Sequence, residues 1–135
     1  MEVNTLVITE TTDEQVVVLK EVGGEQRFPI VIGSYEALAL DRKLRSISLP
    51  RPLTHDLVGN ILTGLDVKLL RVVVTDLKNN TFYAKLVIKR NGKEIEIDSR
   101  PSDAIVLAAQ FKARIYVEEK VLKKASGEIS EEEQT

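Results

Sequence analysis

Cysteine and tryptophan are absent from the sequence, and tyrosine and phenylalanine occur only three times each. Without cysteine, the chain forms no disulfide, no thiolate metal site and no cysteine nucleophile. No apolar run approaches the length of a membrane span, and the first residues lack the features of a signal peptide, so we expect a cytoplasmic protein with no membrane partner. The sequence also lacks a glycine-rich phosphate loop, a G-x-S-x-G elbow, an HExxH motif and a dinucleotide fingerprint, and we expect no organic cofactor.

The remaining composition is that of a globular protein. With 135 residues, of which 43% are hydrophobic and 30% charged, the chain is long enough to bury a core within one domain. A single methionine, beside many valine, isoleucine, glutamate, lysine and arginine residues, favours a thermophilic source.

Charge is distributed unevenly along the chain. Residues 125–135 carry four glutamates and no basic side chain, whereas residues 1–124 carry 19 basic and 17 acidic side chains. We therefore expect a single domain over residues 1–124 and an acidic, disordered tail over residues 125–135. The net charge of −2 is unlike that of a general nucleic-acid binder, but the slightly positive body permits a phosphate-bearing ligand.

Hydrophobic periodicity and turn residues predict an α+β fold, in which helices pack against a largely antiparallel, twisted sheet. The predicted strands cover residues 3–8, 15–22, 27–32, 66–76, 81–89, 93–98 and 114–117. The predicted helices cover residues 34–44, 54–63, a segment that follows Asp98, and residues 118–124. On the second helix, the pattern places Leu57, Ile61 and Leu62 on the core face, and on the first it places Leu38, Leu40 and Leu44 there.

Two short polar segments each precede a predicted helix, and the first contains the only histidine of the chain. In this first segment, helix physics explains Thr54 as an N-cap and Asp56 as a first-turn partner of the helix dipole. His55 is a candidate acid, base or metal ligand because histidine titrates near neutral pH, although a single histidine is often structural. Arg51 lies between two prolines, which suits either a preorganised phosphate ligand or a surface ion pair.

The second polar segment joins the strand that ends at Asp98 to the third helix. Ser99 or Arg100 is the expected N-cap, and Asp103 lies in the first turn, where a carboxylate favours the helix dipole. Asp98 ends a strand and has no such role. Carboxylates at a strand end and at a helix start hold divalent cations through oxygen ligands, and backbone N–H groups at a helix start bind anions. We expect the two polar segments to meet and form the functional site.

Both segments carry the resemblance of the chain to a known family. Arg51-Pro52-x-Thr54-His55-Asp56-Leu57, followed by Ile97-Asp98-Ser99-Arg100-Pro101-Ser102-Asp103-Ala104-Ile105-x-Leu107-Ala108, resembles the bifunctional nuclease family of bacteria and plants. Upstream, Pro29-Ile30-x-Ile32-Gly33 with Glu36-Ala37 is also similar. The resemblance covers about Val3 to Val121 and implies a compact α+β fold, a homodimer and degradation of DNA and RNA. It marks motif positions without assigning roles to them.

Two hypotheses follow from the residues and the resemblance. The first is a nuclease that hydrolyses phosphodiester bonds of RNA or single-stranded DNA with the help of Mg²⁺ or Mn²⁺. Its predicted catalytic residues are His55, Asp98, Arg100 and Asp103. Its predicted substrate-binding residues are Arg51, Thr54, Ser99 and Ser102. Its predicted metal ligands are Asp56, Asp98 and Asp103. The second hypothesis is a non-catalytic binding or regulatory module that uses the same helix starts.

Overall fold

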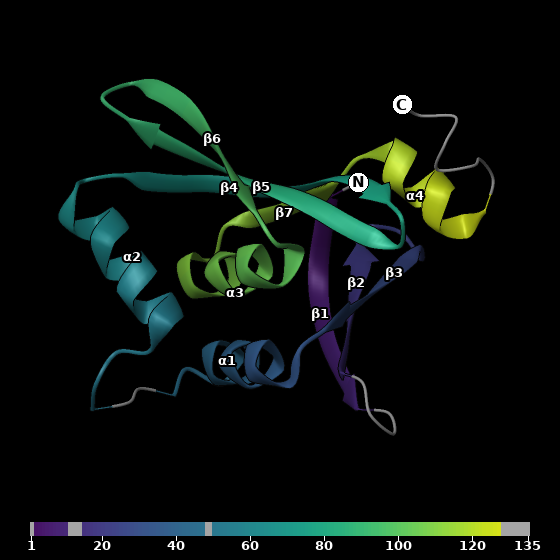
Figure 1. Cartoon of the computed structure of the whole chain (residues 1–135), viewed down its shortest axis with the longest axis horizontal. Helices are drawn as coiled ribbons and strands as arrows, with labels where there is room; N and C mark the ends of the chain where they lie inside the picture. The colour runs from purple at the N-terminus through teal and green to yellow at the C-terminus, as the bar shows by residue number, and fades with distance from the viewer. Residues whose placement is uncertain (1, 11–14, 48–49, 128–135) are drawn as a thin grey trace.

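The computed structural model describes residues 2–10, 15–47 and 50–127, with the backbone alone for residues 2–10. Within these ranges the chain forms seven strands and four helices (Figure 1). The strands are β1 (Glu2–Glu10), β2 (Gln15–Glu21), β3 (Arg27–Ile32), β4 (Lys68–Lys78), β5 (Thr81–Arg90), β6 (Lys93–Ser99) and β7 (Arg114–Val117). The helices are α1 (Ser34–Leu44), α2 (Thr54–Gly64), α3 (Pro101–Phe111) and α4 (Glu119–Ser126).

The seven strands form one sheet in the order β3-β2-β1-β7-β4-β5-β6. Neighbouring strands are antiparallel except β4 and β7, which pair in parallel through residues 71–74 and 114–117. The short strand β7 therefore joins two antiparallel units, β1–β3 and β4–β6. This arrangement confirms the predicted α+β class with a largely antiparallel sheet.

Helix α3 is the centre of the helical layer. Its residues 104–108 are all buried, and α3 contacts strands β4 and β5 on one side and helices α1 and α2 on the other. Figure 1 shows α1 beneath α3 and α2 beside it, while α4 lies at the opposite end of the sheet. Because α3 follows directly from the end of β6, its first turn is fixed both to the sheet edge and to two neighbouring helices.

The core face of α2 differs from the predicted one. Leu57 and Ile61 are 53% and 50% exposed, whereas His55 and Gly59 are buried against α3. The reason is the close approach of the two helices: a Cβ atom on Gly59 would lie 1.9 Å from Nε2 of Gln110. Apolar residues on a helix mark a face that avoids water, but they do not tell which face meets the neighbouring helix.

The predicted face of α1 is also only partly right, since Leu40 is buried but Leu38 and Leu44 are about half exposed. The helix starts are shifted by one residue as well. Gly33 and Leu53, rather than the predicted Ser34 and Thr54, have the extended backbone of an N-cap, and Arg100 is the N-cap of α3. The N-caps of these three helices make no side-chain capping bond, so their first turns are stabilised by other contacts.

Helix α4 is held to the sheet by a buried ion pair. The Nζ atom of Lys124 donates to Oδ1 of Asp76 at 2.8 Å and to the carbonyl of Leu77 at 3.4 Å. Burial alone would raise the pKa of Asp76, but the hydrogen bonds from Lys124 and from the Leu77 N–H outweigh it and lower that pKa. The side chain of Lys124 is fully buried in this cluster, whereas Asp76 is partly exposed, and the pair ties α4 to β4.

Helix α4 is the last element of the described chain. Helix α4 ends at Ser126, and Gly127 follows with a left-handed φ of 80°. The first two residues of the predicted tail are therefore helical, and residues 128–135 of that tail lie outside the described part of the chain. In the described ranges, no helix is long and apolar enough to cross a membrane.

Candidate functional site

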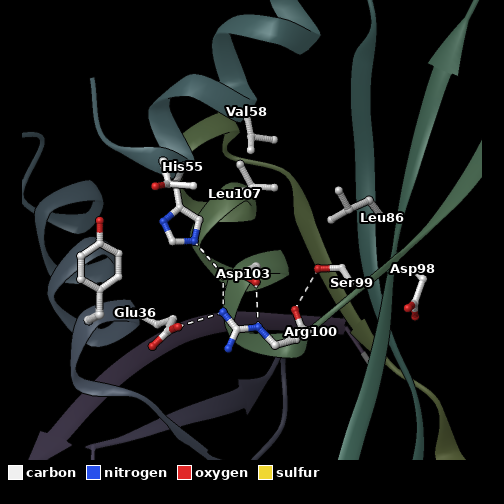
Figure 2. A pocket seen from close by; sticks show the side chains of 11 residues that line it. Glu36, His55, Val58, Leu86, Asp98, Ser99, Arg100, Asp103 and Leu107 are labelled. Atoms are coloured by element: carbon white, nitrogen blue, oxygen red, sulfur yellow. Dashed lines mark hydrogen bonds and ion pairs between the residues drawn. The ribbon is translucent and has the colours of Figure 1, made fainter. Parts of the chain in front are cut away.

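The two polar segments meet, as predicted, at a pocket of about 490 Å³. The first turns of α1, α2 and α3 reach this pocket, and the end of β6 and the middle of β5 close it on the sheet side (Figure 2). One part of its lining is charged, and the other is apolar. The charged part consists of Glu36, Asp98, Arg100 and Asp103, with the polar ring of His55 beside them. The apolar part consists of Val58, Leu86 and Leu107.

A chain of polar contacts links the three helices at the pocket. Nε2 of His55 lies 2.8 Å from Oδ1 of Asp103. Arg100 donates to the same carboxylate through Nε at 3.0 Å and Nη2 at 3.2 Å, and its Nη2 also donates to Oε1 of Glu36 at 2.9 Å (Figure 2). The guanidinium of Arg100 is thereby held between a carboxylate of α1 and a carboxylate of α3, although its side chain is 66% exposed.

These contacts determine the charges in the cluster. Burial would raise the pKa of Asp103, but the hydrogen bonds from Arg100 and His55 outweigh it and lower that pKa. The bonds to Asp103 and Glu36 raise the pKa of Arg100. Asp103 is therefore ionised at neutral pH and can only accept hydrogen bonds. It follows that Nε2 of His55 carries a proton and donates it to Asp103.

The other ring nitrogen of His55 points away from the pocket (Figure 2). Nδ1 is buried and has no hydrogen-bond partner among the described residues. A second cavity of about 20 Å³, large enough for one water molecule, adjoins His55 between α1 and α2. Any exchange of a proton between His55 and the main pocket therefore passes through Nε2, next to Asp103.

Four further predicted residues have different positions at the pocket. Asp98 lines it from the end of β6, apart from the Asp103 cluster, and its side chain makes no hydrogen bond or ion pair within the described ranges (Figure 2). Ser99 lines the pocket and donates from Oγ to the carbonyl of Arg100 at 2.9 Å. Thr54 also lines the pocket and is exposed. Ser102 lies in the first turn of α3 but does not line the pocket.

Arg51 and Asp56 lie away from the main pocket. Arg51 is exposed and absent from the pocket lining. Asp56 accepts a hydrogen bond from the backbone N–H of Leu53 at 2.9 Å and forms an ion pair with Lys43 of α1. The bond with Lys43, followed by that with Leu53, lowers the pKa of Asp56. The carboxylate of Asp56 therefore has the capping role that helix physics assigns to it, and it lines the smaller cavity instead.

Helix α1 contributes two pocket residues, Tyr35 and Glu36, that the sequence did not single out as functional. Glu36 contacts Arg100 across 64 positions of the chain. In the sequence, the one sign that Glu36 belongs to the site was the similarity of the Glu36-Ala37 pair to the family pattern. That similarity did not assign a role to Glu36. Glu36, Asp56 and Asp103 each stand at the third position of their helices, so position alone does not distinguish a pocket residue from a cap.

The donor set for a metal ion is sparse. Within residues 15–47 and 50–127, no three His, Asp or Glu side chains are grouped closely enough to hold one ion. Both carboxylate oxygens of Asp103 already accept hydrogen bonds, and Asp56 is bonded elsewhere. Asp98 has its carboxylate available. A hydrated Mg²⁺ or Mn²⁺ bound through one carboxylate and a substrate phosphate fits such a set.

Comparison with known proteins identifies the family. The model of the bifunctional nuclease domain matches residues 17–130, which is most of the chain, and the protein belongs to this family. An uncharacterized protein of Mycobacterium tuberculosis is 38% identical over 125 residues, covering 93% of this chain and 74% of the relative.

Two plant relatives are more distant. Bifunctional nuclease 1 of Oryza sativa subsp. japonica is 28% identical over 118 residues, covering 84% of this chain and 36% of the relative. Bifunctional nuclease 2 of Arabidopsis thaliana is 29% identical over 107 residues, covering 75% of this chain and 32% of the relative. The chain thus spans about a third of the plant proteins.

Proposed function

We propose that this protein is a nuclease that hydrolyses phosphodiester bonds of RNA or single-stranded DNA at the pocket between α1, α2 and α3. The observation that carries the proposal is the convergence of three helix N-termini on one pocket, at whose edge Arg100 is held by two carboxylates. Helix N-termini and arginine are the groups that bind phosphate. Membership in the family and the printed names of the plant relatives support the same activity.

Arg100 is preorganised for a phosphate. Its Nε and Nη2 atoms are used by Asp103 and Glu36, whereas Nη1 has no partner among the described residues and remains available for a phosphate oxygen. A guanidinium fixed before substrate arrives loses little conformational freedom on binding. In the hydrolysis, Arg100 would neutralise the charge that develops on the phosphate oxygens.

The charge balance of the pocket favours a cation that enters with the phosphate. Glu36, Asp98 and Asp103 bring three negative charges, against one positive charge from Arg100 and the partial charges of three helix N-termini. Asp98 is the residue that we propose to hold a hydrated Mg²⁺ or Mn²⁺, with Asp103 as a weaker candidate because of its existing bonds; the predicted ligand Asp56 lies outside this pocket. When bound, the ion would polarise a phosphate oxygen.

In the proposed reaction, His55 would transfer a proton and Asp103 would orient it. Histidine titrates near neutral pH, and Nε2 of His55 carries a proton directed at Asp103, beside the position proposed for the phosphate. His55 is the proposed proton donor to the leaving oxygen in its imidazolium form, which gives up the Nε2 proton and returns to neutral imidazole with the remaining proton on Nδ1. Asp103, which stays ionised, would hold the side chains of His55 and Arg100 in position through its hydrogen bonds. The hydroxyls of Thr54 and Ser99 lie on the same rim and would bind the substrate.

A second candidate is a binding or regulatory module without catalysis. The observation in its favour is that His55, Arg100, Asp103 and Glu36 satisfy one another without any ligand. Such a cluster would hold three helices together and present an anion site. The two candidates differ in whether the bound phosphodiester is cut.

The test is cleavage of single-stranded RNA and DNA by the purified protein with Mg²⁺, with Mn²⁺ and with a chelator. We expect activity in the wild type and a loss of about 100-fold or more in Asp98→Ala, His55→Ala and Arg100→Ala. Arg45→Ala, which removes an equally exposed arginine outside the pocket, is the matched control and should keep wild-type activity. Equal activity in all variants would indicate a contaminating nuclease, and binding without cleavage would favour the second candidate.

The expected homodimer and cytoplasmic location are also part of this proposal. Leu57 and Ile61 of α2, with its C-cap residue Leu65, form a half-exposed apolar stripe at four-residue spacing. We place the dimer contact on this stripe, and light scattering of Leu57→Glu and Ile61→Glu variants would test it. The inferred thermophilic source stays a prediction.

A further inference from the structure

The charged and apolar walls of the pocket suit a ligand with two chemically different parts. A bare phosphate would use Arg100 and the helix N-termini but leave Val58, Leu86 and Leu107 without a partner. A ligand that fills a pocket of about 490 Å³ must also cover this apolar wall. The pocket therefore recognises more than the sugar-phosphate backbone of a nucleic acid.

Tyr35 supplies the aromatic surface that such a ligand would need. It lies in the first turn of α1, directly before Glu36, whose carboxylate holds Arg100. The residue lines the pocket and is 54% exposed, so part of its ring is open to a ligand. Aromatic side chains next to phosphate-binding groups stack on nucleobases without reading their sequence.

We propose that Tyr35 and the apolar wall of Val58, Leu86 and Leu107 form a nucleobase subsite, which rests on the proposed nuclease function. The base adjacent to the phosphate on Arg100 would stack on Tyr35. A base within a duplex is paired and stacked on its neighbours, so it enters such a pocket only after leaving the helix. The subsite thus gives a physical reason for a single-stranded substrate and makes Tyr35 a specificity-determining residue.

The ligands that separate the two parts of the pocket are uridine 5′-monophosphate and ribose 5-phosphate. Both carry the phosphate and the sugar, but only the first carries a base. Calorimetric titration of the wild type with each, in the presence of Mg²⁺, should give tighter binding of uridine 5′-monophosphate. Tyr35→Ala should weaken this binding by about ten-fold and leave ribose 5-phosphate unchanged. Tyr35→Phe keeps the ring and should bind both as the wild type does.

Tyr83 provides the matched control. It is 43% exposed on β5 and does not line the pocket, so Tyr83→Ala should bind both ligands normally. Equal weakening of both ligands by Tyr35→Ala would overturn the subsite, because the residue would then act by positioning Glu36 and Arg100. Unchanged binding of uridine 5′-monophosphate in Tyr35→Ala would overturn it as well.

Failure of the subsite and failure of the nuclease proposal give different results. If the wild type binds neither ligand and cuts neither RNA nor DNA, the nuclease proposal fails, and the subsite fails with it. If the wild type cuts single-stranded RNA and Tyr35→Ala cuts it with an unchanged KM, the nuclease proposal stands and the subsite alone is wrong. A raised KM with little change in kcat in Tyr35→Ala, absent in Tyr35→Phe, supports both.

Discussion

Helices α2 and α3 begin in the same way, but their first turns have different functions. Each has an N-cap without a side-chain bond and an aspartate at its third position, Asp56 or Asp103. Asp56 turns back to the N–H of its own N-cap residue and to Lys43. Asp103 instead contacts His55 of α2 and Arg100. Helix physics places both carboxylates, and the neighbouring helices decide whether each one caps or faces the pocket.

Exchange of each aspartate for asparagine is the strongest test of this difference. Asp103→Asn removes the charge that orients His55 and Arg100, and we expect nuclease activity to fall by about 100-fold. Asp56→Asn keeps a side-chain oxygen for the Leu53 N–H, so it should lower the free energy of unfolding by about 1 kcal/mol or less and leave activity within a few-fold. Cleavage assays and denaturant unfolding of both variants measure these effects. Similar losses of activity in both would contradict the division of roles.

A substitution at Gly59 can test the different roles of Asp56 and Asp103, because it changes the contact between α2 and α3. A Cβ at this position would displace the amide end of the flexible Gln110 side chain and would lie 3.3 Å from Cζ of Phe111 on α3. We expect the contact with Phe111 to shift α2 and so draw His55 away from Asp103, whereas the bond from Leu53 to Asp56 moves with α2. The matched control is Gly64→Ala, because a Cβ there meets nothing within 4 Å. We expect Gly64→Ala to raise the free energy of unfolding by up to about 1 kcal/mol.

Gly59→Ala should give a lower free energy of unfolding than Gly64→Ala by about 1–3 kcal/mol, because overpacking at α3 opposes the gain in helix propensity. Denaturant unfolding of the two variants gives this difference. Gly59→Ala should also lower activity, since His55 moves. Identical stability and activity of the two alanine variants would mean that the approach of α2 to α3 is not needed for the site.

The sequence predicted the elements well because they depend on local signals. Alternating apolar residues and the Asn91-Gly92 turn predicted the β5–β6 hairpin, and Pro101 predicted the first turn of α3. The meeting of the two polar segments was also predicted. The shifts of the N-caps by one residue follow from backbone angles, which side-chain preferences predict only approximately.

Contacts between distant elements were not predictable in the same way. Glu36 reaches Arg100 from a helix that carried no functional signal, and the inward face of α2 depends on Gly59 meeting α3 rather than on its leucines. Asp103 was expected either to favour its own helix dipole or to act in the site, but its bonds to His55 and Arg100 were not predicted. Such partners are chosen by tertiary packing, to which a single sequence gives no direct access.

Acid denaturation should reveal a smaller effect of the same carboxylates. The pKa values of Asp56 and Asp103 in the folded protein are both lower than the ordinary value of 3.8. Each ionised carboxylate therefore stabilises the fold fully above pH 3.8. This contribution is lost as the pH falls through the lower native pKa. We expect the free energy of unfolding to drop as the pH falls below about 4, and Asp56→Asn and Asp103→Asn each to reduce the drop. Curves that run parallel to the wild type over this range would exclude a contribution from that carboxylate.

The smallest expected effect is spectroscopic and concerns His55. As the only histidine, it gives a single pair of imidazole ¹⁵N signals. In the wild type at neutral pH, we expect Nε2 to be protonated and Nδ1 to be unprotonated, because ionised Asp103 accepts from Nε2 and Nδ1 has no partner among the described residues. Asp103→Asn should move both signals toward a mixture of tautomers, since an amide can also donate to Nε2. Asp56→Asn should leave them in place, although Asp56 is adjacent in sequence. A wild type with Nδ1 protonated and Nε2 unprotonated would reverse the assigned direction of the bond and place the shared proton on Asp103.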